Sequence, residues 1–258
     1  PPYWGQRVYQ SCPSDLGLER TQDEYVCKLA DIFDEVRRCL RHDGVLWLNI
    51  GDGFFCRSVT NRNGATAHLG GDVRGGGEYK LPKRDGGDIK EKDLCGTPWA
   101  VAFELRRRGW YLRDAVIWHK PAPMPGGARD RCTNAYEHVF MLAKSRSYLF
   151  NADAIAEDGK TTQRRNKRNV WTIASARGNG WHFALMPQSL ASVCIEATSH
   201  GGDLVLDPFH GAGSTGIAAV DLGRRYIGIE ASEEFALKSQ EHFANEFGLH
   251  DMERPAAT

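Results

Sequence analysis

The stretch LVLDPFHGAGSTGIAAVDLGRRYIGIE, from Leu204 to Glu230, decides the fold of this chain. Two apolar runs enclose a glycine-rich segment and a helical pattern, and the second run ends on a carboxylate. This order predicts a strand over 204–206, a loop over 207–213, a helix over 214–222 and a strand over 225–230. Such a unit is typical of a Rossmann-like α/β sheet with helices on both faces.

The glycines of this segment, Gly211, Gly213 and Gly216, spell GxGxxG, and Glu230 follows Gly211 by 19 residues. The pattern alone fits a nicotinamide dinucleotide site, or a tight turn whose glycines only allow close packing. A strand-end carboxylate can accept both ribose hydroxyls of any adenosine-bearing cofactor. Asp207 favours S-adenosylmethionine, because a carboxylate attracts its sulfonium and ammonium groups and repels a pyrophosphate. The cofactor contacts expected here are Asp207, Pro208, Phe209, Gly211, Gly213 and Glu230.

Apolar periodicity predicts the other elements of the domain. A Pro/Gly-rich turn at 120–127 separates two of the strands, which suggests a hairpin at one end of the sheet. A chain of 258 residues with 41% hydrophobic content can bury a sizeable core, and we expect one domain over 1–258. The predicted elements are helices over 23–40, 98–107, 187–197 and 233–247, and strands over 45–50, 110–118 and 137–142.

Composition excludes several other classes of protein. Lys plus Arg equals Asp plus Glu at 33 each, so a polyanion would have to meet a local basic surface. The seven cysteines are dispersed without a Cys-x-x-Cys pair, which argues against a disulfide framework and against a metal site. With neither a long apolar run nor a signal-peptide pattern, we expect no membrane partner and a cytoplasmic location.

The chain begins with Pro1-Pro2-Tyr3-Trp4, and consecutive prolines make the backbone rigid because each fixes φ and lacks an N–H. Together with the glycine loop that follows later, this motif resembles the permuted, beta-group amino methyltransferases that act on DNA. In that family an Asp/Asn/Ser-Pro-Pro-aromatic target motif precedes the cofactor loop. The resemblance covers nearly the whole chain, and its other segments are 46–52, Trp118-His119-Lys120-Pro121, His182-Phe183, Asp207 to Gly213 and Glu230.

The resemblance implies an S-adenosylmethionine-dependent enzyme with a permuted order of motifs in a Rossmann-like sheet. Its substrate would be double-stranded DNA, from which a base is flipped into the site. The catalytic residues would be Pro1, Pro2 and Tyr3, with backbone carbonyls accepting the amino hydrogens and Tyr3 stacking on the flipped base. Phe183 would join the cofactor contacts. A catalytic histidine is unnecessary, because the amino proton can leave to water after transfer.

The family distinguishes cytosine N4 from adenine N6 partly by the residue before the prolines, which lies outside this sequence. The extension Tyr3 to Arg7 is more similar to the serine subgroup, so we expect cytosine N4, with adenine N6 as the alternative. RNA or protein-glutamine methylation, a non-catalytic DNA-binding protein and a nicotinamide-dependent oxidoreductase are more distant alternatives. Cytosine C5 methylation is excluded, because it typically needs a Pro-Cys nucleophile and no cysteine here follows a proline.

Two polar segments are candidates for binding DNA. We expect a mobile loop over 53–93 and a target-recognition region over 145–181, which contains a basic run over 164–168. A cognate restriction endonuclease is a further expected partner, and the chain would act as a monomer or a homodimer. We also expect the natural protein to begin before Pro1. The candidate phosphate contacts are Arg57, Arg62, Arg74, Lys80, Lys83, Arg84 and the basic run.

Overall fold

The computed structural model describes residues 1–6, 16–57, 83–159, 164–176 and 185–248, and the structural statements below concern these residues. The predicted elements are present, with ends that differ by at most a few residues. The helices are α1 (Gln22–Cys39), α2 (Thr97–Arg107), α3 (Gln188–Thr198), α4 (Ser214–Asp221) and α5 (Glu233–Phe247). The strands are β1 (Val45–Ile50), β2 (Tyr111–His119), β3 (Tyr136–Ala143), β4 (Glu157–Asp158), β5 (Arg164–Arg165), β6 (Val170–Thr172), β7 (Leu204–Asp207) and β8 (Arg225–Gly228).

The strands form one four-stranded sheet and two short pairs. The large sheet has the order β1-β3-β2-β6, in which β3 runs antiparallel to both of its neighbours and β6 runs parallel to β2. The predicted hairpin of β2 and β3 is therefore confirmed. The glycine segment supplies the parallel pair β7 and β8, as its pattern predicts, and α4 connects these two strands.

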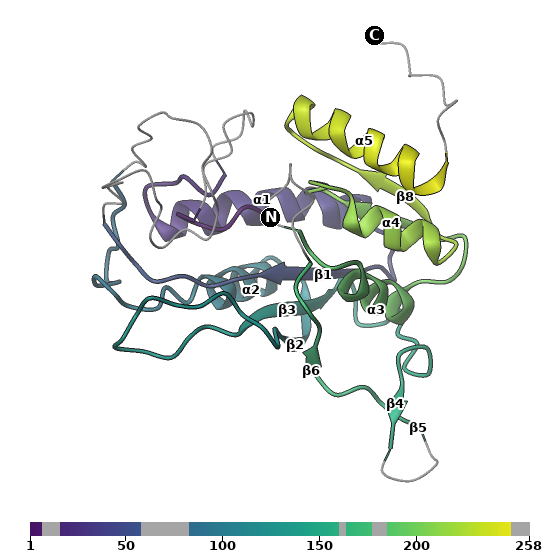
Figure 1. The fold of residues 1–258 in the computed structure, drawn as a ribbon, viewed down its shortest axis with the longest axis horizontal. Helices are drawn as coiled ribbons and strands as arrows, with labels where there is room; N and C mark the ends of the chain where they lie inside the picture. The colour runs from purple at the N-terminus through teal and green to yellow at the C-terminus, as the bar shows by residue number, and fades with distance from the viewer. Residues whose placement is uncertain (7–15, 58–82, 160–163, 177–184, 249–258) are drawn as a thin grey trace.

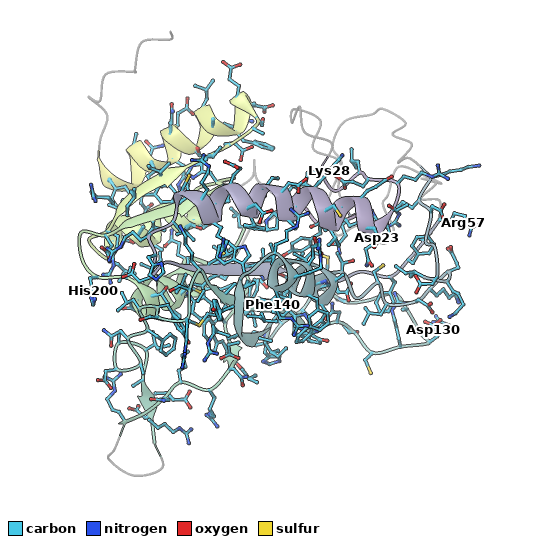
Figure 2. All side chains as sticks on the ribbon, turned by 180° about the vertical axis from the view of Figure 1, so that it is seen from behind. Asp23, Lys28, Arg57, Asp130, Phe140 and His200 are labelled. Carbon is cyan, nitrogen blue, oxygen red and sulfur yellow. The ribbon has the colours of Figure 1, made fainter. Side chains whose placement is uncertain are left out.

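Helices cover both faces of the large sheet. On one face α1 and α2 pack against Phe140 and Leu142 of β3, and on the other α3 packs against Val139. The alternation follows from the period of two in a strand. Phe140 is fully buried, and Figure 2 shows it in the middle of the molecule. The arrangement in Figure 1 is the expected α/β fold with helices on both faces.

The start of α1 shows how the sequence sets an element boundary. The Thr21 hydroxyl accepts the Glu24 N–H, and the Glu24 carboxylate accepts the Thr21 N–H, each at 3.2 Å. This capping box satisfies amide groups that have no partner within the helix. The apolar residues at helical spacing then face the core, and α1 becomes a fixed support for the residues that pack on it.

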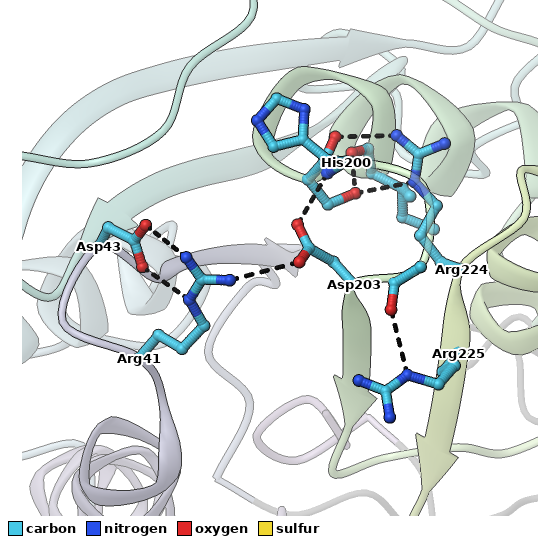
Figure 3. A network of polar contacts seen from close by, with 9 residues as sticks. Arg41, Asp43, His200, Asp203, Arg224 and Arg225 are labelled. Carbon is cyan, nitrogen blue, oxygen red and sulfur yellow. Dashed lines mark hydrogen bonds and ion pairs between the residues drawn. The ribbon is translucent and has the colours of Figure 1, made fainter.

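A polar network joins the large sheet to the β7–β8 pair (Figure 3). Arg41, which follows α1, contacts both carboxylate oxygens of Asp43 and also Asp203, at 3.3 Å, just before β7. Arg224 donates to the Ser199 hydroxyl and carbonyl after α3, at 3.1 and 2.8 Å. These bonds fix how the glycine segment is oriented relative to α1 and α3.

The two ends of the large sheet differ in what surrounds them. Ile50 and its partner His138 mark one end, and Val45 and its partner Ala143 mark the other; we name them the Ile50 end and the Val45 end. The chain passes from β2 to β3 at the Ile50 end, and it leaves β3 at the Val45 end. Asp130 from the β2–β3 connection and His200 lie at opposite ends of the molecule in Figure 2.

The predicted loop over 53–93 is packed at both of its described ends. Phe54 forms a β-bridge with Leu94, and Phe55 is buried in the main core. Arg84 is also buried, with its guanidinium 5.2 Å from the Trp4 ring and 5.6 Å from the Phe55 ring. Residues 58–82 lie outside the described residues. No helix among the described residues is long and apolar enough to span a membrane.

Candidate active site

The Pro-Pro-Tyr-Trp motif lies on α1 beside the Ile50 end of the sheet. The Tyr25 hydroxyl donates to the Pro2 carbonyl at 2.8 Å, which ties the motif to the helix. Trp4 is buried, and its indole N–H donates to the Glu19 carbonyl at 3.0 Å. Pro1, Pro2 and Tyr3 are only partly buried. The motif is thus anchored on the side that faces the core, and it has accessible surface on the opposite side.

Tyr3 is held by a group of polar side chains from three strands or strand ends. Its hydroxyl donates to Glu137 Oε2 at 2.8 Å, and the Asn49 amide donates to the same oxygen at 3.1 Å. The Lys120 ammonium forms an ion pair with Glu137 Oε1. A Cβ on Gly51 would lie 2.7 Å from Tyr3 Cε2, so glycine is needed there for the ring to fit. These contacts fix the position of the Tyr3 ring.

Glu137 and Asn49 are site residues that the sequence did not reveal. Each lies within a strand pattern, and apolar neighbours explain the strand without assigning a role to the polar side chain. Lys120 belongs to the Trp118-His119-Lys120-Pro121 segment noted above, and its ammonium lies 4.5 Å from the Trp118 ring centre. Lys120 is the one hint in the sequence, because a lysine whose charge becomes partly buried needs an acidic partner.

The carboxylates of the glycine segment hold the loop through backbone N–H groups. Asp207 accepts the Phe209 N–H at 2.9 Å and the Thr215 hydroxyl at 2.6 Å. Glu230 accepts the Gly211 N–H at 2.8 Å with one oxygen and the Ser232 N–H at 3.0 Å with the other. The hydrogen bonds that they accept therefore hold both carboxylates in place.

The loop and its carboxylates fit an adenosine cofactor that carries positive charge. Each Glu230 oxygen accepts one backbone N–H bond and keeps a second lone-pair direction for a ribose hydroxyl, and the side chain is only partly buried. Asp207 supplies negative charge nearby, and Gly211 has φ +55°, a conformation that favours glycine. A cavity of about 470 Å³ adjoins the loop at Ala212 and Ser214.

The predicted cofactor residues differ in what they contact. Phe209 packs edge-on against Phe33 of α1, with ring centres 6.1 Å apart, so its ring points into the core. A Cβ on Gly213 would lie 2.3 Å from the Phe243 ring, which shows that this glycine admits α5 close to the loop. Pro208 is partly buried beside Asp207. Phe183 lies outside the described residues.

The target motif and the glycine loop pack on the same helix although they lie at opposite ends of the chain. The Pro2 carbonyl accepts the hydroxyl of Tyr25, and the Phe209 ring lies against Phe33; both of these partners belong to α1. Tyr3 and Phe209 are packed against the same hydrophobic core. The two motifs therefore share one support in the folded chain.

A family model described as DNA methylase, of the N6/N4 methyltransferases, matches residues 1–241. The chain belongs to the N6/N4 DNA methylase family. Type II methyltransferase M.SmaI of Serratia marcescens is 40% identical over 243 residues, covering 93% of this chain and 81% of that protein. Type II methyltransferase M.Cfr9I of Citrobacter freundii is 38% identical over 236 residues, covering 91% and 76%.

Solved structures show the same fold. PvuII DNA methyltransferase, described as cytosine-N4-specific, has a TM-score of 0.68 and 18% identity, covering all of this chain and 79% of its own. A putative DNA modification methylase from Thermus thermophilus, solved with S-adenosyl-L-methionine, has a TM-score of 0.56 and 24% identity, covering 87% and 78%. The prediction of a Rossmann-like methyltransferase fold is confirmed.

Membership of the N6/N4 DNA methylase family settles the class of reaction. The chain is a DNA methyltransferase that modifies amino groups, and its cofactor is S-adenosylmethionine, as the sequence predicts. The cofactor supplies an electrophilic methyl group when it is bound. The nicotinamide-dependent oxidoreductase and the non-catalytic DNA-binding protein are thereby excluded.

The described start of the expected recognition region follows the end of β3 in this DNA methylase. The Lys144 N–H donates to the Gly44 carbonyl at 3.0 Å and the Asn151 N–H to the Ala197 carbonyl at 2.7 Å, so this stretch follows the Val45 end. The β4–β5 hairpin continues from there and projects from the molecule in Figure 1. Tyr3 lies at the Ile50 end, whereas the described residues that follow β3, 144–159, begin at the Val45 end.

Several candidate phosphate contacts of the DNA methylase are already engaged. Arg84 is buried against the rings of Trp4 and Phe55, which corrects the expectation that it meets DNA. Arg165 and Arg168 both pair with Glu157 in the hairpin region, at 3.1 and 2.6 Å. Arg57 is exposed, as Figure 2 shows. Arg62, Arg74 and Lys80 lie outside the described residues.

We predict that replacing Glu137 with glutamine destabilises the DNA methylase by about 2 kcal/mol, because a part-buried, charged hydrogen-bond acceptor is lost. The change removes the ion pair with Lys120 and leaves the amide facing either Lys120 or the Tyr3 hydroxyl. Thermal and urea denaturation will measure the free energy of unfolding. Glu157→Gln is the control, because its arginine partners are exposed and a smaller change is expected. Equal losses for the two variants would contradict the special role of Glu137.

Proposed function

We propose that this chain methylates the exocyclic N4 amino group of cytosine in double-stranded DNA, at a site formed by Pro1, Pro2 and Tyr3 beside the glycine loop. The observation that supports this most directly is that both motifs pack on α1, the Pro-Pro-Tyr motif through Tyr25 and the glycine loop through Phe33. An amino group and a methyl donor must be brought into line for direct transfer. A target motif and a cofactor loop that pack on the same helix are consistent with this requirement.

The Pro-Pro backbone offers one carbonyl for the amino group. The Pro2 carbonyl already accepts the Tyr25 hydroxyl. The Pro1 carbonyl accepts no hydrogen bond from the described residues, and the proline after it keeps its direction fixed. We assign to the Pro1 carbonyl the role of accepting one amino hydrogen. This bond orients the nitrogen lone pair, which is otherwise conjugated into the base, towards the methyl group.

The other residues position the base and the cofactor. Tyr3 provides the stacking surface, and Glu137 holds its ring in place through the phenol hydroxyl. Glu230 would accept the ribose hydroxyls, and Asp207 would attract the positive charge of the cofactor. The amino proton passes to water after transfer, so no side chain needs to act as a general base.

Two features support cytosine N4 over adenine N6. The extension after the prolines resembles the serine subgroup of the family, and here it is part of the fold: Trp4 is buried and the Gln6 amide donates to the Asp52 carbonyl at 3.1 Å. PvuII DNA methyltransferase, a cytosine-N4-specific enzyme by its description, shares the fold over the whole length of this chain. The relatives named as type II methyltransferases support a cognate restriction endonuclease as a partner.

We propose that DNA is recognised by segments that leave the sheet at the Ile50 end. These are the β2–β3 connection, residues 120–135, and the part of the expected region that follows β6. The parallel pairing of His119 with Thr172 directs the chain after β6 towards the same end as Tyr3. Arg129 of the connection is exposed and would contact phosphate, whereas Arg131 already packs on the Phe54 ring and pairs with Asp130.

The test is to incubate the protein with isotope-labelled S-adenosylmethionine and mixed-sequence duplex DNA, and then to analyse the nucleosides by mass spectrometry. We expect label in N4-methylcytosine and none in N6-methyladenine. Label in N6-methyladenine alone would overturn the assignment to cytosine while leaving the family intact. An RNA of matched sequence serves as the control substrate and should remain unlabelled.

A further inference from the structure

A partly buried histidine of the glycine loop, His210, faces the C-terminal helix. His210 Nδ1 is 2.7 Å from the Tyr226 hydroxyl of β8, and His210 Nε2 is 2.9 Å from the Ser239 hydroxyl of α5. The Phe243 ring closes the group, with its centre 5.7 Å from the imidazole and stacked on Tyr226. One imidazole ring thus connects the loop, the second strand of the pair and the helix that covers them.

The direction of each hydrogen bond follows from the supply of donors and acceptors. The Ser239 hydroxyl donates to the Ala236 carbonyl at 2.8 Å, so it accepts from His210 Nε2. His210 Nδ1 then carries no proton and accepts the Tyr226 hydroxyl. In the opposite tautomer, the Ser239 hydroxyl would have to leave the Ala236 carbonyl to donate to Nε2, and the Tyr226 hydroxyl would lose Nδ1 as its acceptor. The arrangement therefore requires a neutral imidazole with its proton on Nε2.

Charge and burial agree with a neutral ring. Burial lowers the pKa of His210, and the carboxylates of Asp207 and Glu230 oppose the shift without cancelling it. Burial, followed by the charge of Asp207, raises the pKa of Tyr226, which keeps its hydroxyl protonated as a donor. These are the charged and titratable groups that face His210 from β7, β8 and the residues after β8.

The glycines of this region make room for the group. A Cβ on Gly228 would lie 2.3 Å from His210 Nδ1, and a Cβ on Gly216 would lie 2.4 Å from Phe243 and 2.5 Å from Tyr226. Gly213 meets Phe243 in the same way. The glycine pattern thus serves the packing of His210, Tyr226 and α5 at these positions, while Gly211 bonds to Glu230.

We propose that His210 is a positioning residue for cofactor binding, which holds the loop of Asp207 and Gly211 in register through its bonds to Tyr226 and Ser239. The inference rests on the proposed placement of the cofactor at this loop. His210 lies between the Phe209 side chain, which is anchored on α1, and Gly211, whose N–H is bonded to Glu230. A loss of the imidazole bonds would let the loop shift and would weaken the ligand contacts on both sides of it.

The test measures S-adenosylhomocysteine binding by calorimetry for His210→Gln, Tyr226→Phe and Ser239→Ala. Each variant removes one or two part-buried hydrogen bonds, and we expect affinity to fall about tenfold for His210→Gln and about threefold for the others. In methylation assays the KM for S-adenosylmethionine should rise while the KM for DNA and kcat at saturating cofactor change little. Unchanged S-adenosylhomocysteine affinity in His210→Gln would overturn the proposal.

The pH profile separates positioning from general loss of structure. The folded-state pKa of His210 lies below the ordinary value of 6.5, so wild-type affinity should be constant above that pH and fall as the pH drops below it. Glutamine cannot titrate, so the His210→Gln profile should be flatter between pH 5 and 8. His138→Gln is the matched control, because burial also lowers the pKa of His138 but the residue lies on β3.

Two outcomes separate a failure of the positioning role of His210 from a failure of the cofactor placement. If the His138→Gln variant lost the pH dependence and His210→Gln kept it, the positioning role would be wrong. If the wild type and Glu230→Ala bound S-adenosylhomocysteine with equal affinity, the placement of the cofactor at this loop would fail instead. Nitrogen NMR of labelled histidines adds a direct readout: a proton on Nε2 of His210 is expected, and a proton on Nδ1 would contradict the hydrogen-bond order.

Discussion

Replacing Tyr3 with alanine is expected to slow methylation by about a hundredfold, because a base that stacks on an aromatic ring loses about 1–3 kcal/mol when the ring is removed. The Tyr3 ring is held by Glu137 and seated on Gly51, so the stacking surface is already formed before DNA binds. S-Adenosylhomocysteine affinity should stay nearly unchanged. Single-turnover methylation and calorimetry will measure the two quantities.

Tyr3→Phe is the control for the alanine variant. It keeps the ring and removes only the hydroxyl that donates to Glu137, so we expect about a fivefold loss of rate. A rate for Tyr3→Phe as low as that for Tyr3→Ala would mean that the hydroxyl, and not the ring, carries the effect. A loss of cofactor affinity in Tyr3→Ala would show that the residue belongs to the cofactor site.

The elements of this fold could be predicted because each one carries a local signal. The apolar period of α1 with its Thr21 cap and the glycine punctuation around β1 and β7 are readable in single segments. The pairing of strands is not local. The order β1-β3-β2-β6 depends on which apolar faces meet, and β6 is too short to be seen as a strand in the sequence.

The site was predicted in part, for related reasons. Asp207 and Glu230 lie at or just after strand ends, where a polar residue is conspicuous, and the loop after Asp207 packs on α1, which also holds Pro2. Glu137 lies inside a strand, and its partners Tyr3, Asn49 and Lys120 come from three distant segments. Only the folded chain shows that these side chains share one carboxylate.

The recognition region shows how a contiguous prediction can divide in space. Chain order places 145–181 between the two motifs, and basic residues mark it as a DNA contact. The antiparallel direction of β3 takes the chain to the Val45 end first, and only β6 brings it back. Strand direction therefore decides which basic residues lie near Tyr3, and composition carries no information about direction.

Replacing Glu230 with alanine is expected to weaken S-adenosylhomocysteine binding by on the order of a hundredfold, because hydrogen bonds to a charged group are worth about 1.5–3 kcal/mol. The loss has two sources in this structure. The ribose hydroxyls would lose their acceptors, and the N–H groups of Gly211 and Ser232 would lose theirs. Calorimetry gives the affinity, and methylation at saturating cofactor should recover most of the rate.

Glu230→Gln and Glu233→Ala resolve these two sources. Glutamine keeps one oxygen, so it can hold either Gly211 or Ser232 but not both, and an intermediate affinity is expected. Glu233 lies exposed in the first turn of α5, three residues after Glu230, and its loss should leave the affinity unchanged. Equal losses in Glu230→Ala and Glu233→Ala would mean that a loosened α5, and not the carboxylate at the loop, controls binding. Normal affinity in Glu230→Ala would show that Glu230 does not bind the ribose, because the loss expected from removing that contact is too large to go undetected.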